Sequence, residues 1–273
     1  MKRFSIGEVE RDGKISISIV ADEVMHFVST MEGSGVVNVE RSGDSAKTYS
    51  LTGEIYEISS ELCNEFIIDG LLEADKFELN YAKIPIPNTL LKIKCKKFSS
   101  AFLKDQKVKK WLELVDGPLE IIKITEIGIV EGLGRMKQLK NVTKELIAVG
   151  TDITDEELKD LNDYGTLVLN SDHITENGVM DKFEKWLELP VTSGNHFEIR
   201  YIPSSPEFTK TQIFKNLPRA EMKWTQYFAF DMKYTQKSGK VEEFTGFYFV
   251  HNEYHLIKVL ISTDFKPRIV NRK

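Results

Sequence analysis

Cysteine is scarce in this chain of 273 residues, which contains only Cys63 and Cys95. Two separated cysteines cannot build a disulfide framework, and they predict no zinc site. No apolar run approaches the roughly 18 residues that a membrane-spanning helix requires. Residues 1–14 include basic side chains but no apolar core segment, so we expect no secretory signal. Together these absences predict a cytosolic protein without a membrane partner.

The motifs of common catalytic sites are also missing. The chain has no G-x-S-x-G and no G-K-[ST], and its paired glycines Gly132 and Gly134 lack a third glycine at Lys137. His251 and His255 fall in an expected turn rather than on a helix, so their spacing predicts no metal site. We therefore predict no cofactor and favour a non-enzymatic protein.

Lysine is abundant, outnumbering arginine 29 to 8, and it is concentrated in residues 92–110. This segment contains eight lysines and one aspartate, a charge of +7, whereas the other 254 residues hold 29 basic and 41 acidic side chains, a charge of −12. Focused positive charge attracts anions, so we predict that the segment binds nucleic acid or an acidic protein. The alternative is that these lysines are solvated and only discourage aggregation.

The start of this segment alternates apolar and basic side chains, which is typical of a strand. Lys92, Lys94 and Lys96 would share one face about 7 Å apart, close to the phosphate spacing of a nucleic-acid strand. Ser99 or Ser100 can cap a following helix that adds further lysines. A helix N-terminus after Gly134 also favours anions. The predicted anion-binding residues are Lys92, Lys94, Lys96, Lys97, Lys104, Lys107, Lys110, Arg135 and Lys137.

A second interpretation is an atypical metal-dependent nuclease. Asp231 and Lys233 form a D-x-K pair on an expected strand, and Glu198 on another strand could supply a second carboxylate for Mg²⁺. Such triplets are frequent by chance in a chain with 29% charged residues, and they also suit a solvated strand face. Convergence of Glu198 and Asp231 would favour this enzyme. A third interpretation is an inhibitory or structural subunit that acts through protein contacts.

Hydrophobic periodicity predicts the α+β class, with mixed or antiparallel sheets and interspersed helices. The Asp12-Gly13 turn predicts an N-terminal β-hairpin. Alternation over residues 222–234 predicts one long strand, which begins a C-terminal meander of three antiparallel strands. The aromatic side chains of this strand, Trp224, Phe228 and Phe230, are expected to be buried.

Helical spacing of apolar residues predicts helices over residues 24–31, 61–71, 135–147 and 176–189, with Ser60 as a cap and another short helix from Ser205. Thr154 and Glu157 fit a capping box. We find no internal repeat. The weakest joint, near residues 150–154, divides the chain into an expected domain at 1–150, which bears the lysine-rich segment, and another at 151–273, which ends in the meander.

Overall fold

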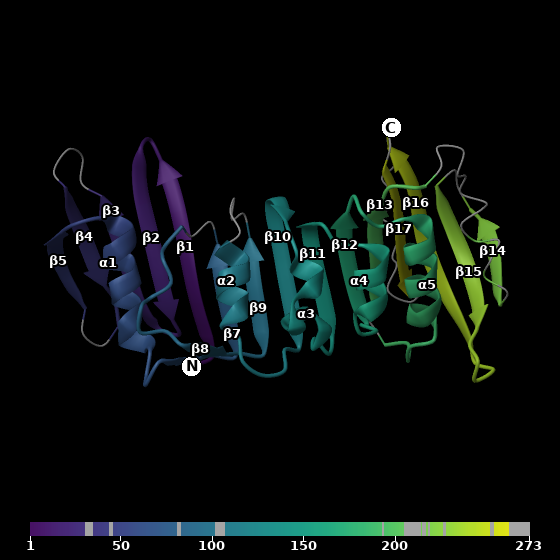
Figure 1. Ribbon diagram of the computed structural model, residues 1–273, viewed down its shortest axis with the longest axis horizontal. Helices are drawn as coiled ribbons and strands as arrows, with labels where there is room; N and C mark the ends of the chain where they lie inside the picture. Colours follow the sequence, from purple (N-terminus) through teal and green to yellow (C-terminus); the bar gives the residue numbers. More distant parts are fainter. Residues whose placement is uncertain are drawn as a thin grey trace, which may run out of the picture. The chain divides into compact units, whose positions relative to one another are not determined.

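The chain forms two compact units, Met1–Val130 (unit 1) and Glu131–Lys273 (unit 2), and both combine a sheet with helices (Figure 1). We describe them from a computed structural model. It describes residues 1–30, 35–43, 46–80, 83–101, 107–192, 194–204, 214, 217, 219–225, 228–251 and 254–261, without the side chains of 126, 127, 251 and 261. The predicted domain division at residue 150 stays a prediction. No helix in the described part of the chain is long and apolar enough to cross a membrane.

The strands of unit 1 lie in the order β10-β9-β7-β1-β2-β3-β4-β5. Strands β1 to β5 form an antiparallel meander, whereas β7, β9 and β10 continue from β1 in parallel. A small separate sheet pairs β6 with β8. The bounds are β1 Arg3–Arg11, β2 Lys14–Ala21, β3 Val24–Thr30, β4 Val36–Arg41, β5 Lys47–Thr52, α1 Ile55–Leu62, η1 Cys63–Phe66, β6 Leu71–Glu73, β7 Lys76–Asn80, β8 Lys92–Lys94, β9 Lys97–Ala101, α2 Lys107–Glu113 and β10 Ile121–Val130.

The strands of unit 2 lie in the order β11-β12-β13-β17-β16-β15-β14. Strands β11, β12 and β13 are parallel, and the remaining pairs are antiparallel. The predicted α+β class and C-terminal meander are therefore confirmed. The bounds are η2 Leu133–Arg135, α3 Lys137–Lys140, β11 Glu145–Thr151, α4 Asp155–Asp160, β12 Thr166–Ser171, α5 Glu176–Leu187, β13 His196–Tyr201, β14 Ala220–Trp224, β15 Ala229–Thr235, β16 Val241–His251 and β17 Tyr254–Ile261.

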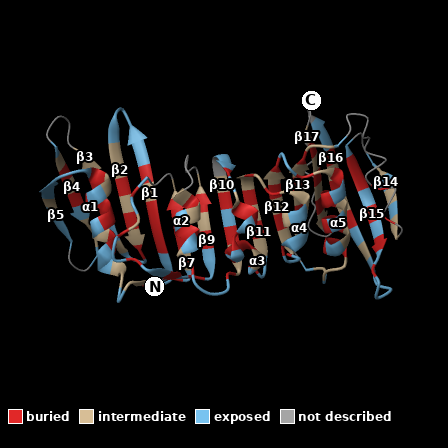
Figure 2. Ribbon diagram, viewed as in Figure 1, coloured by how far each residue is buried: buried red, intermediate tan, exposed pale blue. Residues whose placement is uncertain are grey.

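Each core lies between one face of a sheet and its helices. In unit 1 a row of aromatic rings fills this space: Phe77 packs on Phe4, Phe98 and Trp111 with ring centroids 5.7, 5.7 and 5.5 Å away. Buried residues alternate with more exposed ones along the strands (Figure 2). The opposite side of each sheet bears no described helix, and we call it the open face.

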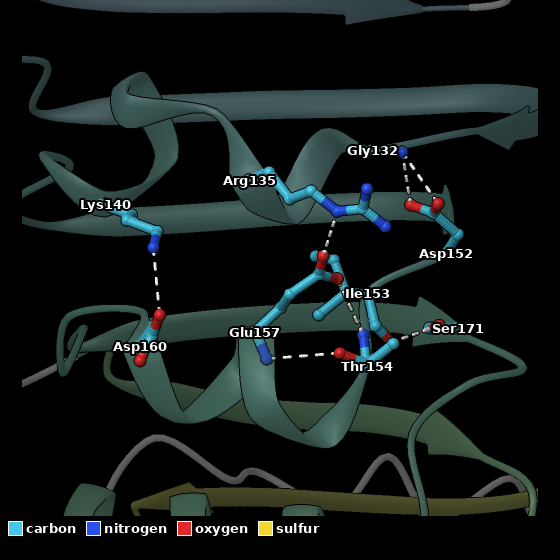
Figure 3. Close-up of polar contacts among 9 residues, drawn as sticks. All are labelled: Gly132, Arg135, Lys140, Asp152, Ile153, Thr154, Glu157, Asp160 and Ser171. Atoms are coloured by element: carbon cyan, nitrogen blue, oxygen red, sulfur yellow. Dashed lines mark hydrogen bonds and ion pairs between the residues drawn. The ribbon is translucent and has the colours of Figure 1, made fainter.

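Local sequence signals predicted several elements correctly. The hairpin of β1 and β2 turns at Asp12 and Gly13, whose φ values of 52° and 74° suit the two central positions of a type I′ turn. The capping box is present as well, because the Thr154 side chain accepts from the Glu157 amide and the Glu157 carboxylate accepts from the Thr154 amide (Figure 3). Helix α5 also matches its prediction.

Other predicted helices are wrong. Residues 24–30 form β3, because pairing with β2 on one side and β4 on the other outweighs the helical spacing of their apolar residues. Ser60 lies inside α1 rather than before a helix. Ser99 and Ser100 belong to β9 and cap nothing. The helix expected over residues 135–147 is short, since β11 begins at Glu145.

The expected strand over residues 222–234 is two strands, β14 and β15, which pair as a hairpin. The meander therefore contains four described strands instead of three. Phe230 is buried as predicted, but Trp224 is only half-buried and Phe228 is exposed. The short helix predicted from Ser205 lies outside the described residues.

Unit 2 contains a structural repeat that was not apparent in the sequence. Strands β11 and β12 are each followed by a buried isoleucine, Ile153 or Ile174, and then by the N-cap threonine of a helix. The Ser171 hydroxyl of the second repeat donates to the Ile153 carbonyl of the first, and the amide of Gly132, which precedes both repeats, donates to Asp152 (Figure 3). Stacked strand–helix units bury a shared core, as in repeat proteins.

Candidate functional site

The lysines at the start of the lysine-rich segment are exposed but already paired. Lys92 and Lys94 lie on β8, and Lys96 follows that strand. Each ammonium group meets a carboxylate from a distant part of unit 1. The pairs are Lys92–Asp116 at 3.0 Å, Lys94–Glu73 at 3.1 Å and Lys96–Asp75 at 2.8 Å. Surface pairs of this kind contribute little stability, but their carboxylates offset the positive charge that a phosphate would meet.

Lys97, Arg135 and Lys137 lie on other elements than β8. Lys97 is exposed at the start of β9, in a different sheet from β8. Lys104 lies outside the described residues. In unit 2 the Arg135 guanidinium binds Glu157 at 2.8 Å (Figure 3), while Lys137 is exposed at the first position of the four-residue helix α3.

A groove in unit 1 does bring together two of the predicted lysines. It has a volume of about 400 Å³ and lies between α2 and the segment that follows β7. Lys107 and Lys110 are three residues apart and so share one side of α2. Trp111 and Ile84, both almost fully buried, supply apolar walls. The lining residues are Ile84, Pro85, Ile86, Lys107, Lys110 and Trp111.

A buried carboxylate holds Lys83, the residue that precedes the groove-lining Ile84. The Glu8 side chain is 3% exposed, and it pairs with the Lys83 ammonium at 3.0 Å and accepts from the Lys83 amide at 2.9 Å. The Tyr56 hydroxyl also donates to Glu8, at 3.2 Å. The bond to Glu8 raises the pKa of Lys83, and burial followed by the Glu8 charge raises the pKa of Tyr56. Glu8 is therefore matched by Lys83 and does not neutralise the groove's lysines.

Neither groove lysine forms an ion pair with a described residue. Lys107 donates from Nζ to the Lys83 carbonyl at 2.9 Å, which positions the ammonium without neutralising it. Lys110 is exposed and makes no ion pair within the described part of the chain. An apolar surface beside two ammonium groups suits a ligand that joins an apolar group to carboxylates. The groove was missed from sequence because Pro85-Ile86-Pro87 was interpreted as a turn only.

The residues of the nuclease interpretation do not converge. Glu198 lies on β13 and Asp231 on β15, with β17 and β16 between them. Three strand spacings amount to about 14 Å, whereas carboxylate oxygens lie about 2.0–2.6 Å from a shared Mg²⁺ or Ca²⁺. Lys233 is paired with Glu243 at 3.1 Å. No group of three or more His, Cys, Asp or Glu within the described residues is placed to hold a metal ion.

Glu198 has a structural environment of its own. Its Oε2 atom lies 3.0 Å from Nε2 of His196 and 2.7 Å from the Lys258 ammonium. The bond to His196, and then that to Lys258, lowers the pKa of Glu198 to about 2. Because the folded pKa lies below the ordinary value of 4.5, this stabilisation is present above about pH 4.5 and is lost as the pH falls toward 2.

We expect Glu198→Gln to lower the free energy of unfolding by about 1–3 kcal/mol at pH 7, because the neutral amide loses the charge-assisted bonds. Near pH 2.5 the difference in free energy of unfolding between the variant and the wild type should be only a fraction of its value at pH 7. Urea unfolding of both proteins at the two pH values measures this. If the variant loses the same free energy of unfolding at both pH values, the ionised Glu198 does not stabilise the fold through a lowered pKa.

The two cysteines, Cys63 and Cys95, are free and buried. Burial raises the pKa of each thiol to about 12, so neither is activated as a nucleophile. Comparison of the chain with protein-family models, with curated proteins and with solved structures found no match.

Proposed function

We propose that this is a non-enzymatic binding protein of the cytosol, and that its groove beside α2 takes an acidic protein segment. The observation that carries the proposal is the placement of Lys107 and Lys110 beside the apolar walls of Ile84 and Trp111. A glutamate or aspartate of the partner would meet the ammonium groups, and a neighbouring apolar side chain would enter the groove. Two reduced, buried thiols support the cytosolic part of the proposal.

An acidic protein segment is favoured over nucleic acid by the pairing of the exposed lysines. Glu73, Asp75 and Asp116 lie within ion-pair distance of the strand lysines, so a phosphate backbone there would meet carboxylates as well as ammonium groups. The apolar walls of this groove of about 400 Å³ suit an aliphatic side chain better than a charged phosphate backbone. A protein segment supplies both parts of the complementary chemistry.

The test compares two sets of lysines with one probe, a labelled and capped eight-residue peptide of alternating glutamate and leucine. We expect Lys107→Gln with Lys110→Gln to weaken its binding about five- to thirtyfold, since each ammonium contributes roughly 0.5–1 kcal/mol at an exposed rim. The matched control changes Lys92, Lys94 and Lys96 to Gln. This control removes more positive charge than the groove variant does, but it should weaken peptide binding less.

Fluorescence anisotropy at several salt concentrations measures both affinity and its salt dependence. A single-stranded DNA oligonucleotide is titrated in parallel. If DNA binds and the control set, rather than the groove pair, reduces its salt slope, the strand lysines form the functional surface. Absence of peptide binding at about 1 mM, with or without DNA binding, counts against the groove.

A further inference from the structure

Three phenylalanine rings form a cluster on unit 2, in which Phe228 and Phe249 are exposed and Phe247 is half-buried. Phe228 stacks on Phe249 with ring centroids 5.0 Å apart, and Phe247 stacks on Phe249 at 6.1 Å. Phe228 is 38% exposed and Phe249 39%, although large aromatic side chains gain free energy by leaving water. Contiguous exposed apolar groups of this kind mark interaction surfaces more often than isolated ones do.

The cluster lies on the open face of the unit 2 sheet. Along β16 the alternate residues Phe244 and Tyr248 are buried in the core, so Phe247 and Phe249 point to the opposite side. The core side of the strand is already occupied by large side chains. A one-residue shift of register could therefore not bury the cluster without exposing Phe244 and Tyr248.

A hollow of about 560 Å³ adjoins the cluster along the same strand. Residue Thr245 of β16 lines the hollow, and the next residue on the same face is Phe247. Cross-strand register brings Asp231 of β15 opposite Thr245 and Lys223 of β14 opposite Asp231. The lining residues are Glu221, Met222, Lys223, Asp231, Met232, Lys233, Glu243, Phe244 and Thr245.

The charge of this hollow indicates what it can accept. It contains three carboxylates and two ammonium groups, a net charge of −1. Lys233 is paired with Glu243 at 3.1 Å, whereas Glu221 makes no ion pair within the described residues. Lys258 lies opposite Phe247 in register, but its ammonium is bound by Glu198 at 2.7 Å. The surface therefore favours a cation and disfavours a phosphate backbone.

From these observations we propose that the open face of unit 2 docks an extended protein segment that combines apolar side chains with a lysine or arginine. The apolar side chains cover Phe228, Phe247 and Phe249, and the basic side chain enters the hollow beside Asp231 and Glu221. The two subsites share β16, so one extended segment spans both. This surface lies in a different unit from the groove of the proposed function and does not depend on it.

The experiment uses the full chain and two labelled, capped peptides. The first has the sequence Ser-Phe-Ser-Leu-Ser-Arg-Ser-Arg, and the second has glutamate in place of both arginines. We expect the arginine peptide to bind at least about tenfold more tightly than the glutamate peptide. Phe249→Ser and Asp231→Asn should each weaken the arginine peptide at least about fivefold, while Val9→Ser, an exposed apolar residue of unit 1, leaves it unchanged.

Several outcomes would overturn this proposal. They are no binding of the arginine peptide at about 1 mM, equal binding of both peptides, or unchanged binding by the Phe249 and Asp231 variants. Self-association that Phe249→Ser abolishes would assign the surface to a second copy instead. Single-stranded DNA binding that the same variant abolishes would assign it to nucleic acid. Asp231→Asn keeps the test valid if Phe249→Ser fails to fold, because Asp231 is exposed.

Discussion

Replacing Phe230 with alanine is expected to lower the free energy of unfolding by about 3–5 kcal/mol, the usual range for truncating a buried phenylalanine. Its side chain is fully buried, and its ring lies 4.9 Å from Phe214 and 5.4 Å from Trp224 between centroids. The same ring covers Gly246 on the neighbouring strand so closely that a Cβ there would overlap it. Urea unfolding followed by circular dichroism measures the loss.

Phe249→Ala is the matched control, because Phe249 belongs to the same meander but lies on the open face. Its loss should be below about 1 kcal/mol, since the site is exposed and leaves no enclosed cavity. Equal losses for the two variants would contradict the assignment of the core to the helix-bearing face.

Replacing Lys182 with methionine should cost about 2–4 kcal/mol, because the substitution leaves buried acceptors without their donor. Lys182 is 2% exposed on α5. Its ammonium donates to the Leu161 carbonyl at 2.7 Å, to the Asn162 carbonyl at 2.8 Å and to the Asp163 carboxylate at 2.9 Å. It thereby fixes the end of α4 against α5. Burial lowers the pKa of Lys182, and the three bonds compensate for the buried charge.

Lys185→Met on the same helix is the control, because Lys185 is exposed. The control should change stability by less than about 0.5 kcal/mol. Thermal unfolding of the two variants beside the wild type separates the effects. If Lys182→Met is as stable as the wild type, its three bonds do not hold the two helices together.

Elements fixed by short-range chemistry could be predicted from the sequence. The Asp12-Gly13 turn depends on two residues that tolerate positive φ, and the Thr154–Glu157 capping box depends on bonds within one helical turn. Helix α5 combines a long apolar stripe with a proline beyond its end. Each of these signals lies within a dozen residues of the structure that it specifies.

Elements fixed by distant partners could not be predicted from the sequence. The apolar residues of β3 fit helical spacing, and only β2 and β4 on either side make that segment a strand. The single alternating pattern over residues 222–234 could not show where a hairpin interrupts it. The repeat in unit 2 was hidden because it is defined by buried positions such as Ile153 and Ile174 and by bonds across about twenty residues.

Only the local part of the candidate site could be predicted from the sequence. Composition alone located the lysine-rich segment and included Lys107 and Lys110. It could not reveal that Asp116 would pair with Lys92 from 24 residues away, or that Lys107 would bond the Lys83 carbonyl across another 24. Those long-range contacts decide which lysines keep an uncompensated charge. The strongest lysine pattern in the sequence, on β8, is thus the most neutralised in the structure.

Hydrogen exchange of the full chain, with and without the glutamate–leucine peptide, tests the central proposal most directly because it locates the bound segment. We expect the peptide to slow exchange of amides in α2 and in residues 83–87, and to leave β8 unchanged. The Lys107→Gln and Lys110→Gln double variant should lose that protection while keeping its fold. Protection confined to β8 or to unit 2, or protection that persists in the double variant, would contradict an acidic-segment site in the groove.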